Sequence, residues 1–363
     1  MGLIFMKRMV KKPLKDIKVN DILAEDAVNA QGILLACRGT VITPFILTRL
    51  QSQMRDSYCI LSEEETEDVW EEKYEELVDK TEEKEKLVFS EQLKERVAQG
   101  VEYIYSNLNS EEAVSESANI SEELLDTINH TTAIRMSLMD LKVSDEYTFK
   151  HSVDVATMAL MIGKRLNFEE KELHLLGMAG ILHDVGKIKI SNDILNKPDK
   201  LTDEEFDAIK MHTVYGYEVL ADKKLSESVK KAVLQHHERM DGTGYPSGLS
   251  GEEIGIFGRI LTVADVFDAL VTERPYHEAY TPATAVEMLM AKTMHFDMKV
   301  LKAFLDTVIL YPVGTIVNLS NGECAKVLKN ISSYPQRPVV VGMDSGKVYD
   351  LFHDFQYANI VIL

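Results

Sequence analysis

Six histidines of this chain stand in short, distinctive contexts within one helical stretch: His151, His183, His212, His236, His237 and His277. His183 is followed directly by Asp184 and ends an apolar run, so a buried helix should deliver the pair into the core. A charged Asp in an apolar interior is costly unless it is paired or bound to metal. This dipeptide alone favours a helix-end hydrogen bond, and only its neighbours favour a metal site.

Those neighbours form a set of inward-facing or helix-terminal ligands on five predicted helices. The set comprises His151, His183, Asp184, His212, His236, His237 and Asp265. Such a set suits a metal cluster inside a helical bundle. Imidazole and carboxylate without thiolate favour iron or manganese over a structural zinc. An aspartate shared by several histidines also suits two bridged ions, which can activate water and clamp a phosphodiester.

Two motifs carry a resemblance to a known family. Residues 183–187 read HDVGK and match the HDxGK core of HD-domain phosphohydrolases. Residues 236–246 read HHERMDGTGYP and match the HHE…DGxGYP signature of the HD-GYP subgroup. The chain therefore resembles HD-GYP proteins over residues 140–310. Residues 13–61 also resemble an accessory region that precedes some HD-GYP domains.

The resemblance implies a role for each matching ligand. It implies His151, His183, Asp184 and Asp265 around one metal, and His212, His236 and His237 around the other. Asp184 would bridge the two ions, and Lys187 would lie beside the nucleophilic hydroxide and the phosphate. Asp184 and Lys187 are therefore the expected catalytic residues.

The resemblance also implies substrate contacts. Arg274 matches an arginine that grips phosphate, a bidentate task, although a helix-end salt bridge is the simpler interpretation. Tyr245 would stack or hydrogen-bond near a guanine, with Gly244 beside it. Loop architecture without substrate contact explains these two residues equally well. His277 replaces a basic residue of the family, which would make phosphate binding weaker or pH-dependent.

The number of metals follows from a departure from the family pattern. Some members carry a glutamate four residues before the first ligand histidine, where it helps to hold a third ion. Here that position is Tyr147, and Glu146 is displaced by one residue. The sequence therefore predicts two divalent ions.

The predicted fold is mainly α, an HD-type helical bundle flanked by a small β-rich N-terminal module and a small β C-terminal module. The predicted domains are residues 1–62, an acidic helical linker region at 63–140, the catalytic domain at 141–310 and a β module at 311–363. Residues 93–108 and 120–141 show helical periodicity, while residues 107–119 break it. We also expect a helix around Trp70 and a hairpin turn at residues 29–32 within the N-terminal module. Short strands are expected at residues 315–319, 325–328, 338–341 and 348–351.

Composition restricts the partners. The 363 residues carry a net charge of −19, which disfavours binding to polynucleotides or anionic lipid. Cys37, Cys59 and Cys324 are scattered, so we expect no disulfide framework and a reducing compartment. No stretch approaches 18 apolar residues, which predicts a cytoplasmic protein without a membrane span.

The function expected from these features is hydrolysis of cyclic di-GMP to linear pGpG, and onward to GMP, through a metal-bridging hydroxide. An HD phosphohydrolase for another cyclic dinucleotide is one alternative, and a non-catalytic receptor or scaffold is another. The expected partners besides cyclic di-GMP are a second copy of the chain, as a homodimer, and a signalling protein bound through the flanking modules.

Overall fold

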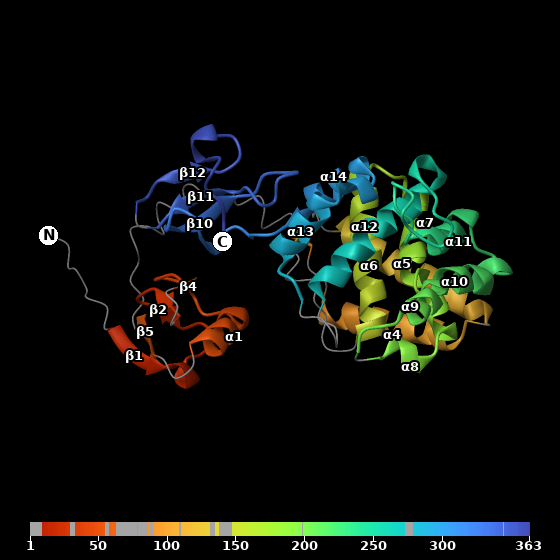
Figure 1. The fold of residues 1–363 in the computed structure, drawn as a ribbon, viewed down its shortest axis with the longest axis horizontal. Coiled ribbons are helices and arrows are strands. Elements are labelled where there is room, and N and C mark those ends of the chain that lie inside the picture. The colour runs from red at the N-terminus through yellow and green to blue at the C-terminus, as the bar shows by residue number, and fades with distance from the viewer. Residues whose placement is uncertain are drawn as a thin grey trace. The chain divides into compact units, whose positions relative to one another are not determined.

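The computed structural model describes residues 9–29, 33–54, 58–62, 78, 86–87, 90–108, 110–130, 135–137, 147–197, 199–272, 279–343 and 345–363. The chain divides into two compact units. The first contains residues 1–80, 311–331 and 336–363, and the second contains residues 81–310 and 332–335. Both β-rich ends of the chain therefore belong to the first unit, and the predicted mainly α fold with small β sheets at either end is confirmed (Figure 1).

The N-terminal part of the first unit is a small β structure with one helix. Its strands are β1 (Met9–Pro13), β2 (Ile22–Leu23), β3 (Ala27–Val28), β4 (Leu34–Ala36) and β5 (Tyr58–Ser62), and η1 covers Leu14–Asp16. The sheet order is β1-β5-β2, and β3 pairs with β4 as the predicted hairpin. Helix α1 (Pro44–Gln53) begins at Pro44 because the Thr43 side chain accepts a hydrogen bond from the Ile46 amide.

The C-terminal part of the first unit is an antiparallel sheet in the order β12-β11-β10-β9. These strands are β9 (Ile316–Asn318), β10 (Cys324–Lys329), β11 (Val339–Gly342) and β12 (Val348–Asp350), followed by η5 (Phe355–Tyr357). All four lie where alternating apolar residues and turn signals predicted strands. Their inner faces bury Val317, Val327 and Val340 in a separate small core.

One expectation about the first unit is wrong. Cys37 and Cys324 form a disulfide across 287 residues of sequence, with their Cα atoms 6.2 Å apart. Spacing along the chain gave no sign of this pairing, because only the fold brings the two ends of the chain together.

The second unit is a helical bundle. Its helices are α4 (Glu91–Ser106), α5 (Glu111–His130), α6 (Tyr147–Arg165), α7 (Glu170–Leu182), α8 (Asn192–Leu195), α9 (Asp203–Lys210), α10 (His212–Ala221), α11 (Glu227–Gln235), α12 (Ile256–Val271), α13 (Pro282–Ala291) and α14 (Met298–Thr307). Short 3-10 turns are η2 (Val185–Lys189), η3 (Gly251–Glu253) and η4 (Thr293–His295). Strands β6 (Lys86–Leu87), β7 (Arg135–Ser137) and β8 (Val308–Ile309) form a small parallel sheet that the sequence did not predict.

Helix α6 runs through the middle of this bundle and packs against α4, α7, α12 and α14 (Figure 1). Helix α7 is buried continuously from Leu176 to Leu182, as its apolar run predicted. Helix α5 begins at Glu111, so the expected break over residues 107–119 is wrong for most of its length. The acidic side chains Glu111 and Glu112 lie in the first turn, where the helix dipole favours negative charge. The predicted helix around Trp70 lies outside the described residues.

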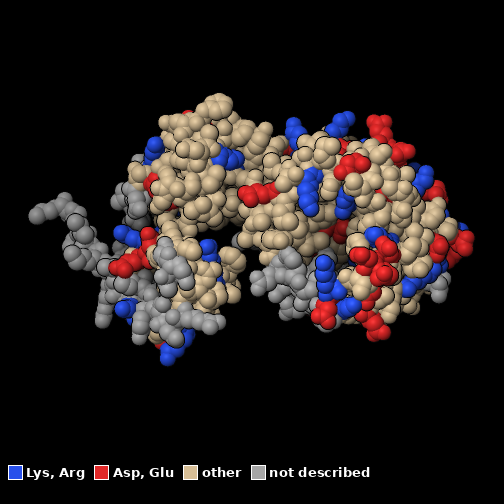
Figure 2. All heavy atoms as spheres, viewed as in Figure 1, with Lys and Arg blue, Asp and Glu red and all other residues tan. Residues whose placement is uncertain are grey.

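The surface of the helical unit carries charged side chains of both signs. On the face that Figure 2 shows, acidic and basic side chains are interspersed over the helical unit rather than gathered into one basic area. None of the helices within the described ranges combines the length and the apolar composition that crossing a bilayer requires.

Candidate metal centre

Five helices bring the predicted ligands to one buried place in the bundle. His151 lies in the second turn of α6, His183 ends α7, His212 begins α10, His236 ends α11 and Asp265 lies within α12. Asp184 and His237 follow their partner histidines directly. Apart from His237, all of these side chains are buried.

Three of the histidines are held in the same way. The Nδ1 atom of His183 lies 2.8 Å from the carbonyl of Gly180, three residues earlier. His212 and His236 make the same contact at 2.7 Å, each with the carbonyl three residues earlier. A carbonyl can only accept, so this geometry assigns the proton to Nδ1 and leaves the Nε2 lone pair for a metal.

The Nε2 atoms then converge in pairs. Those of His183 and His151 are 3.2 Å apart, and those of His212 and His236 are also 3.2 Å apart. His212 and His236 both carry their proton on Nδ1, and two unprotonated nitrogens at this distance repel each other unless a cation lies between them. We call His151, His183 and Asp265 the carboxylate side of the centre, and His212, His236 and His237 the imidazole side.

Asp184 lies between the two sides. Its Oδ2 is 3.4 Å from His183 Nε2 and 3.6 Å from His151 Nε2. Its Oδ1 is 3.4 Å from His212 Nε2 and 3.9 Å from His236 Nε2. This Oδ1 is buried and has no hydrogen-bond partner among the described residues. A buried carboxylate oxygen without a donor, surrounded by imidazole nitrogens, fits a divalent metal.

Asp265 also contacts both sides. Its Oδ1 lies 3.2 Å from His151 Nε2, and its Oδ2 lies 3.5 Å from His237 Nδ1. The resemblance placed Asp265 with the first metal alone. The structure adds a second neighbour for it on the imidazole side.

The two sides differ in protonation. Burial alone would lower the pKa of His151, but the hydrogen bonds that its ring donates to Asp265 and Asp268 raise it to about 10. On the imidazole side, burial lowers the pKa of His212, His236 and His237, and that of His237 falls to about 3. Without a metal, His151 is therefore a cation, and the imidazole side is neutral.

Both carboxylate ligands are ionised. Burial opposes their charge, but Lys187 and His183 hold the pKa of Asp184 well below its usual range. The pKa of Asp265 is likewise lowered by His151 and His237 against the effect of burial. Lys187 Nζ donates to Asp184 Oδ2, so the predicted electrostatic partner lies directly on the bridging carboxylate.

The loop with the GYP sequence covers the imidazole side. The ring of Tyr245 stacks on His237, with centroids 4.7 Å apart. Gly244 has no room for a side chain, because a Cβ atom there would lie 2.4 Å from the backbone of Glu238 and of Arg239. Gly244 therefore positions the loop, and Tyr245 lies against a candidate ligand.

Four residues near the centre escaped the sequence analysis. The Asp268 carboxylate accepts a hydrogen bond from His151 Nδ1 at 2.6 Å and so orients that ring. Glu238 is buried and accepts from the amides of Ser247 and Leu249, which anchors the loop. Arg239 and Tyr105 are the other two residues. One sequence feature could have indicated Asp268, because it lies three residues after Asp265 and so on the same face of the apolar helix α12.

Tyr105, at the end of α4, comes from outside the motifs. Its hydroxyl lies 3.2 Å from Ser152 Oγ, beside His151. Burial and then the charge of Asp184 raise its pKa, so the phenol stays protonated. Arg239 is half-buried; burial lowers its pKa, and Asp265 and Tyr245 counter that effect.

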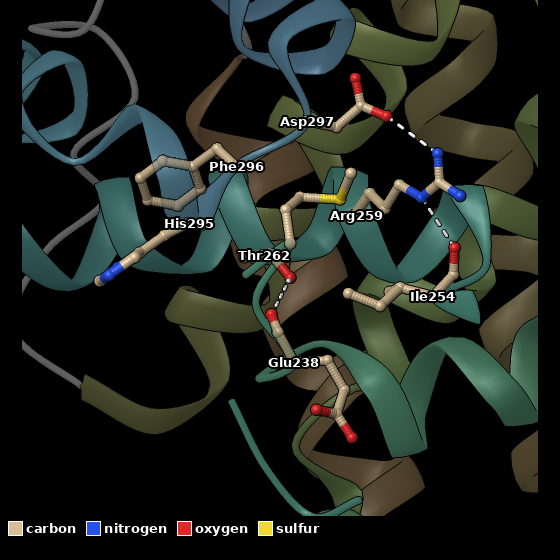
Figure 3. Close-up of a pocket in the computed structure, with 8 residues that line it drawn as sticks. Glu238, Ile254, Arg259, Thr262, His295, Phe296 and Asp297 are labelled. Carbon is tan, nitrogen blue, oxygen red and sulfur yellow. Dashed lines mark hydrogen bonds and ion pairs between the residues drawn. The ribbon is translucent and has the colours of Figure 1, made fainter. Parts of the chain in front are cut away.

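A second layer of polar contacts holds α11, α12 and the loop together around a narrow hollow (Figure 3). Thr262 Oγ1 donates to the carbonyls of His236 and Glu238, at 2.9 and 3.4 Å. Arg259 donates to Asp297 at 3.0 Å and to the Ile254 carbonyl at 2.7 Å. These contacts fix the helix end that carries the histidine pair.

Three expected residues are not tested by this geometry. Arg274 and His277 lie outside the described residues, and so does the side chain of Tyr147. Substrate binding by Arg274 and His277 and the two-metal count stay predictions.

Comparison with known proteins gives a family match. Residues 135–300 match the family described as HD domain. Cyclic di-GMP phosphodiesterase PA4108 of Pseudomonas aeruginosa is 41% identical over 203 residues, which are 56% of this chain and 49% of that protein. The 3'3'-cGAMP-specific phosphodiesterase 3 of Vibrio cholerae is 39% identical over 149 residues, 41% of this chain and 32% of that protein. This chain thus spans about half, or less, of each relative's length.

Among solved structures, Bd1817, a HDG"Y"P protein from Bdellovibrio bacteriovorus, matches with a TM-score of 0.48 and 19% identity. That match covers 82% of this chain and 98% of the other.

Proposed function

We propose that this chain is a metal-dependent phosphodiesterase that hydrolyses cyclic di-GMP to linear pGpG, because its motifs and the match of residues 135–300 to the HD-domain family support that activity. One observation carries the proposal. The two oxygens of Asp184 face different pairs of imidazole nitrogens, and one of these oxygens is buried without a donor. This is the arrangement that a carboxylate bridging two cations needs.

HD-domain phosphohydrolases depend on metals, and the described residues offer three overlapping groups of candidate ligands. We propose that two ions, iron or manganese, are held by His151, His183, Asp184, His212, His236, His237 and Asp265. When bound, such ions supply the positive charge that activates water and clamps a phosphodiester.

The chain's own residues would then have separate tasks. The backbone carbonyls hold each histidine so that Nε2 faces the centre, and Asp268 does the same for His151. Lys187 stays close enough to the bridging carboxylate to stabilise charge that develops on the attacked phosphate. Tyr245 covers the imidazole side, where it would contact a bound base.

The choice of cyclic di-GMP rests on relatives rather than on a base-reading contact. The Pseudomonas relative is named for this substrate. The Vibrio relative is named for 3'3'-cGAMP, which supports the mixed cyclic dinucleotide as a second candidate. The metal ions would bind phosphate, and their ligands do not distinguish bases. A panel of the two substrates under equal conditions therefore discriminates between these candidates.

A non-catalytic receptor is the third candidate. The described ligand set has no missing member, whereas a degenerate centre would lack some of its ligands. Elemental analysis of protein purified without oxygen, paired with a cyclic di-GMP turnover assay, tests the proposal. Bound cyclic di-GMP that stays intact in the metal-loaded protein would favour the receptor.

We further propose that the chain forms a homodimer and that the β-rich first unit binds a signalling protein. Sedimentation of the purified chain tests the dimer. A truncated chain without the flanking modules should keep turnover and lose the partner.

A further inference from the structure

Arg239 lies at the edge of the metal centre. It follows His237 by two residues, and the loop residue Gly244 passes directly over its backbone. Its side chain is half-buried, and its charge interacts with Asp265 and Tyr245. The residue therefore lies next to the imidazole side of the centre, beside the loop that carries Tyr245.

The hydrogen bonding of Arg239 is incomplete within the part of the chain that the structure describes. Its guanidinium makes one hydrogen bond there, from Nη1 to the carbonyl of its neighbour Glu238, at 3.2 Å. It forms no ion pair with any described carboxylate. Arg259, by contrast, has both a carboxylate and a carbonyl partner. A guanidinium carries five donors, so most of those on Arg239 are available to a ligand.

Charge makes an anion the fitting ligand. Bound divalent ions would take up the negative charge of Asp265, the carboxylate that acts most strongly on Arg239, and would leave only Asp241 and Glu238 among the described acids that act on it. A half-buried cation beside two metal ions is then unfavourable until an anion joins it. Arginine binds phosphate oxygens with paired hydrogen bonds.

We propose that Arg239 binds the phosphate of the substrate that is not being cleaved. The inference rests on the proposed function, in which the substrate is a cyclic dinucleotide with two phosphodiester groups. The metal ligands surround the place of the attacked phosphate. Arg239 is not one of the candidate ligands and forms no ion pair with a described carboxylate, which leaves its donors for the second phosphate.

The test compares Arg239→Gln with Lys231→Gln, which removes the same charge from an exposed position on α11. Each is assayed with cyclic di-GMP and with bis(p-nitrophenyl) phosphate, which has a single phosphodiester. We expect Arg239→Gln to raise KM for cyclic di-GMP about tenfold or more, with kcat nearly unchanged. Turnover of bis(p-nitrophenyl) phosphate and metal content should stay at the wild-type level, and Lys231→Gln should behave as wild type.

A second readout does not depend on turnover. In a Lys187→Ala background that slows hydrolysis, calorimetric titration with cyclic di-GMP should show the same loss of affinity for Arg239→Gln. An unchanged affinity would overturn the inference. So would a parallel loss with bis(p-nitrophenyl) phosphate, because that result means a structural role or a contact with the attacked phosphate.

Failure of the proposed function looks different. It appears in the wild-type protein, as turnover of bis(p-nitrophenyl) phosphate without turnover of cyclic di-GMP. The same two variants are then titrated with 3'3'-cGAMP, which also carries two phosphates. Equal affinity of the variants there would refute the role of Arg239.

Discussion

The carboxylate side and the imidazole side of the metal centre hold similar ligands in opposite electrostatic states. On the carboxylate side, the acids Asp265 and Asp268 keep a proton on His151, whose pKa is raised to about 10. On the imidazole side, burial and mutual repulsion keep the histidines neutral, and the pKa of His237 falls to about 3. The chain thus balances its buried acids with its own cations on one side, and keeps neutral imidazoles on the other.

This difference has a consequence for metal binding. A ligand must lose its proton before it can bind a metal. Binding on the carboxylate side must release the proton of His151 at neutral pH, whereas the imidazole side is already deprotonated. Lys187, which pairs with Asp184, would share that carboxylate with the metal and remain beside the centre.

The largest expected effect comes from the residue that joins the two sides. Asp184→Asn keeps the shape but removes the charge that both sides share, so turnover and metal pairing should be abolished. Turnover and metal stoichiometry are measured together. A variant with wild-type activity and two bound ions would show that the bridge lies elsewhere, with Asp265 as the next candidate because it too contacts both sides.

The next effect separates chemistry from binding. Lys187→Ala should lower kcat by roughly 10²–10³-fold, as the loss of a single electrostatic donor does. Arg274→Ala should instead raise KM more than it lowers kcat, because it acts on substrate in ground and transition state alike. Both parameters are measured at saturating metal, with metal content checked in each variant. The reverse pattern, with KM raised by Lys187→Ala and unchanged in Arg274→Ala, would exchange the two roles.

A smaller effect should be confined to the carboxylate side. Asp268→Asn weakens the hydrogen bond that orients His151, which should lower metal affinity by about 10–100-fold. Titration of the metal-free protein should show one weakened site and one unchanged site. Asp199→Asn, in an exposed loop, removes the same charge and serves as the control. Equal weakening of both sites would contradict the division of the centre into two sides.

The sequence predicted the candidate metal ligands, but not the residues that hold those ligands in place. The seven candidate ligands could be found because their types are rare in apolar helices and their motifs are contiguous. Asp268 and Tyr105 support His151 and its neighbour through contacts 117 and 47 residues apart in sequence, and no local pattern encodes such a pairing. Arg274 and His277 lie outside the described residues, so their expected roles stay predictions.

The fold shows the same division. Strands and helices with clear periodicity were predicted, down to the hairpin before Leu34 and the four C-terminal strands. The parallel pairing of β6, β7 and β8 was missed because each strand has only two or three residues, too few for a pattern. The Cys37–Cys324 disulfide was missed because it depends on which chain ends meet in space.

The smallest expected effect is the pH dependence of stability in the metal-free protein, and here the two sides should act with opposite sign. His151 has a raised pKa, so its contribution to stability is fully present below the unfolded value of about 6.5 and is lost as pH rises through about 10. His237 has a lowered pKa, so between about pH 6.5 and pH 3 it is neutral in the native state and protonated in the unfolded chain. Its contribution is therefore lost as pH falls below about 6.5, at roughly 1.4 kcal/mol per pH unit down to about 3.

Urea unfolding of metal-free protein at pH 5 and pH 6.5 measures the difference. Stability should rise with pH over this interval in the wild type, and His237→Phe should reduce the rise, while His151→Phe should not. A wild-type stability that falls between pH 5 and pH 6.5 would mean that the imidazole side carries protons without its metal, and the contrast between the two sides would not hold.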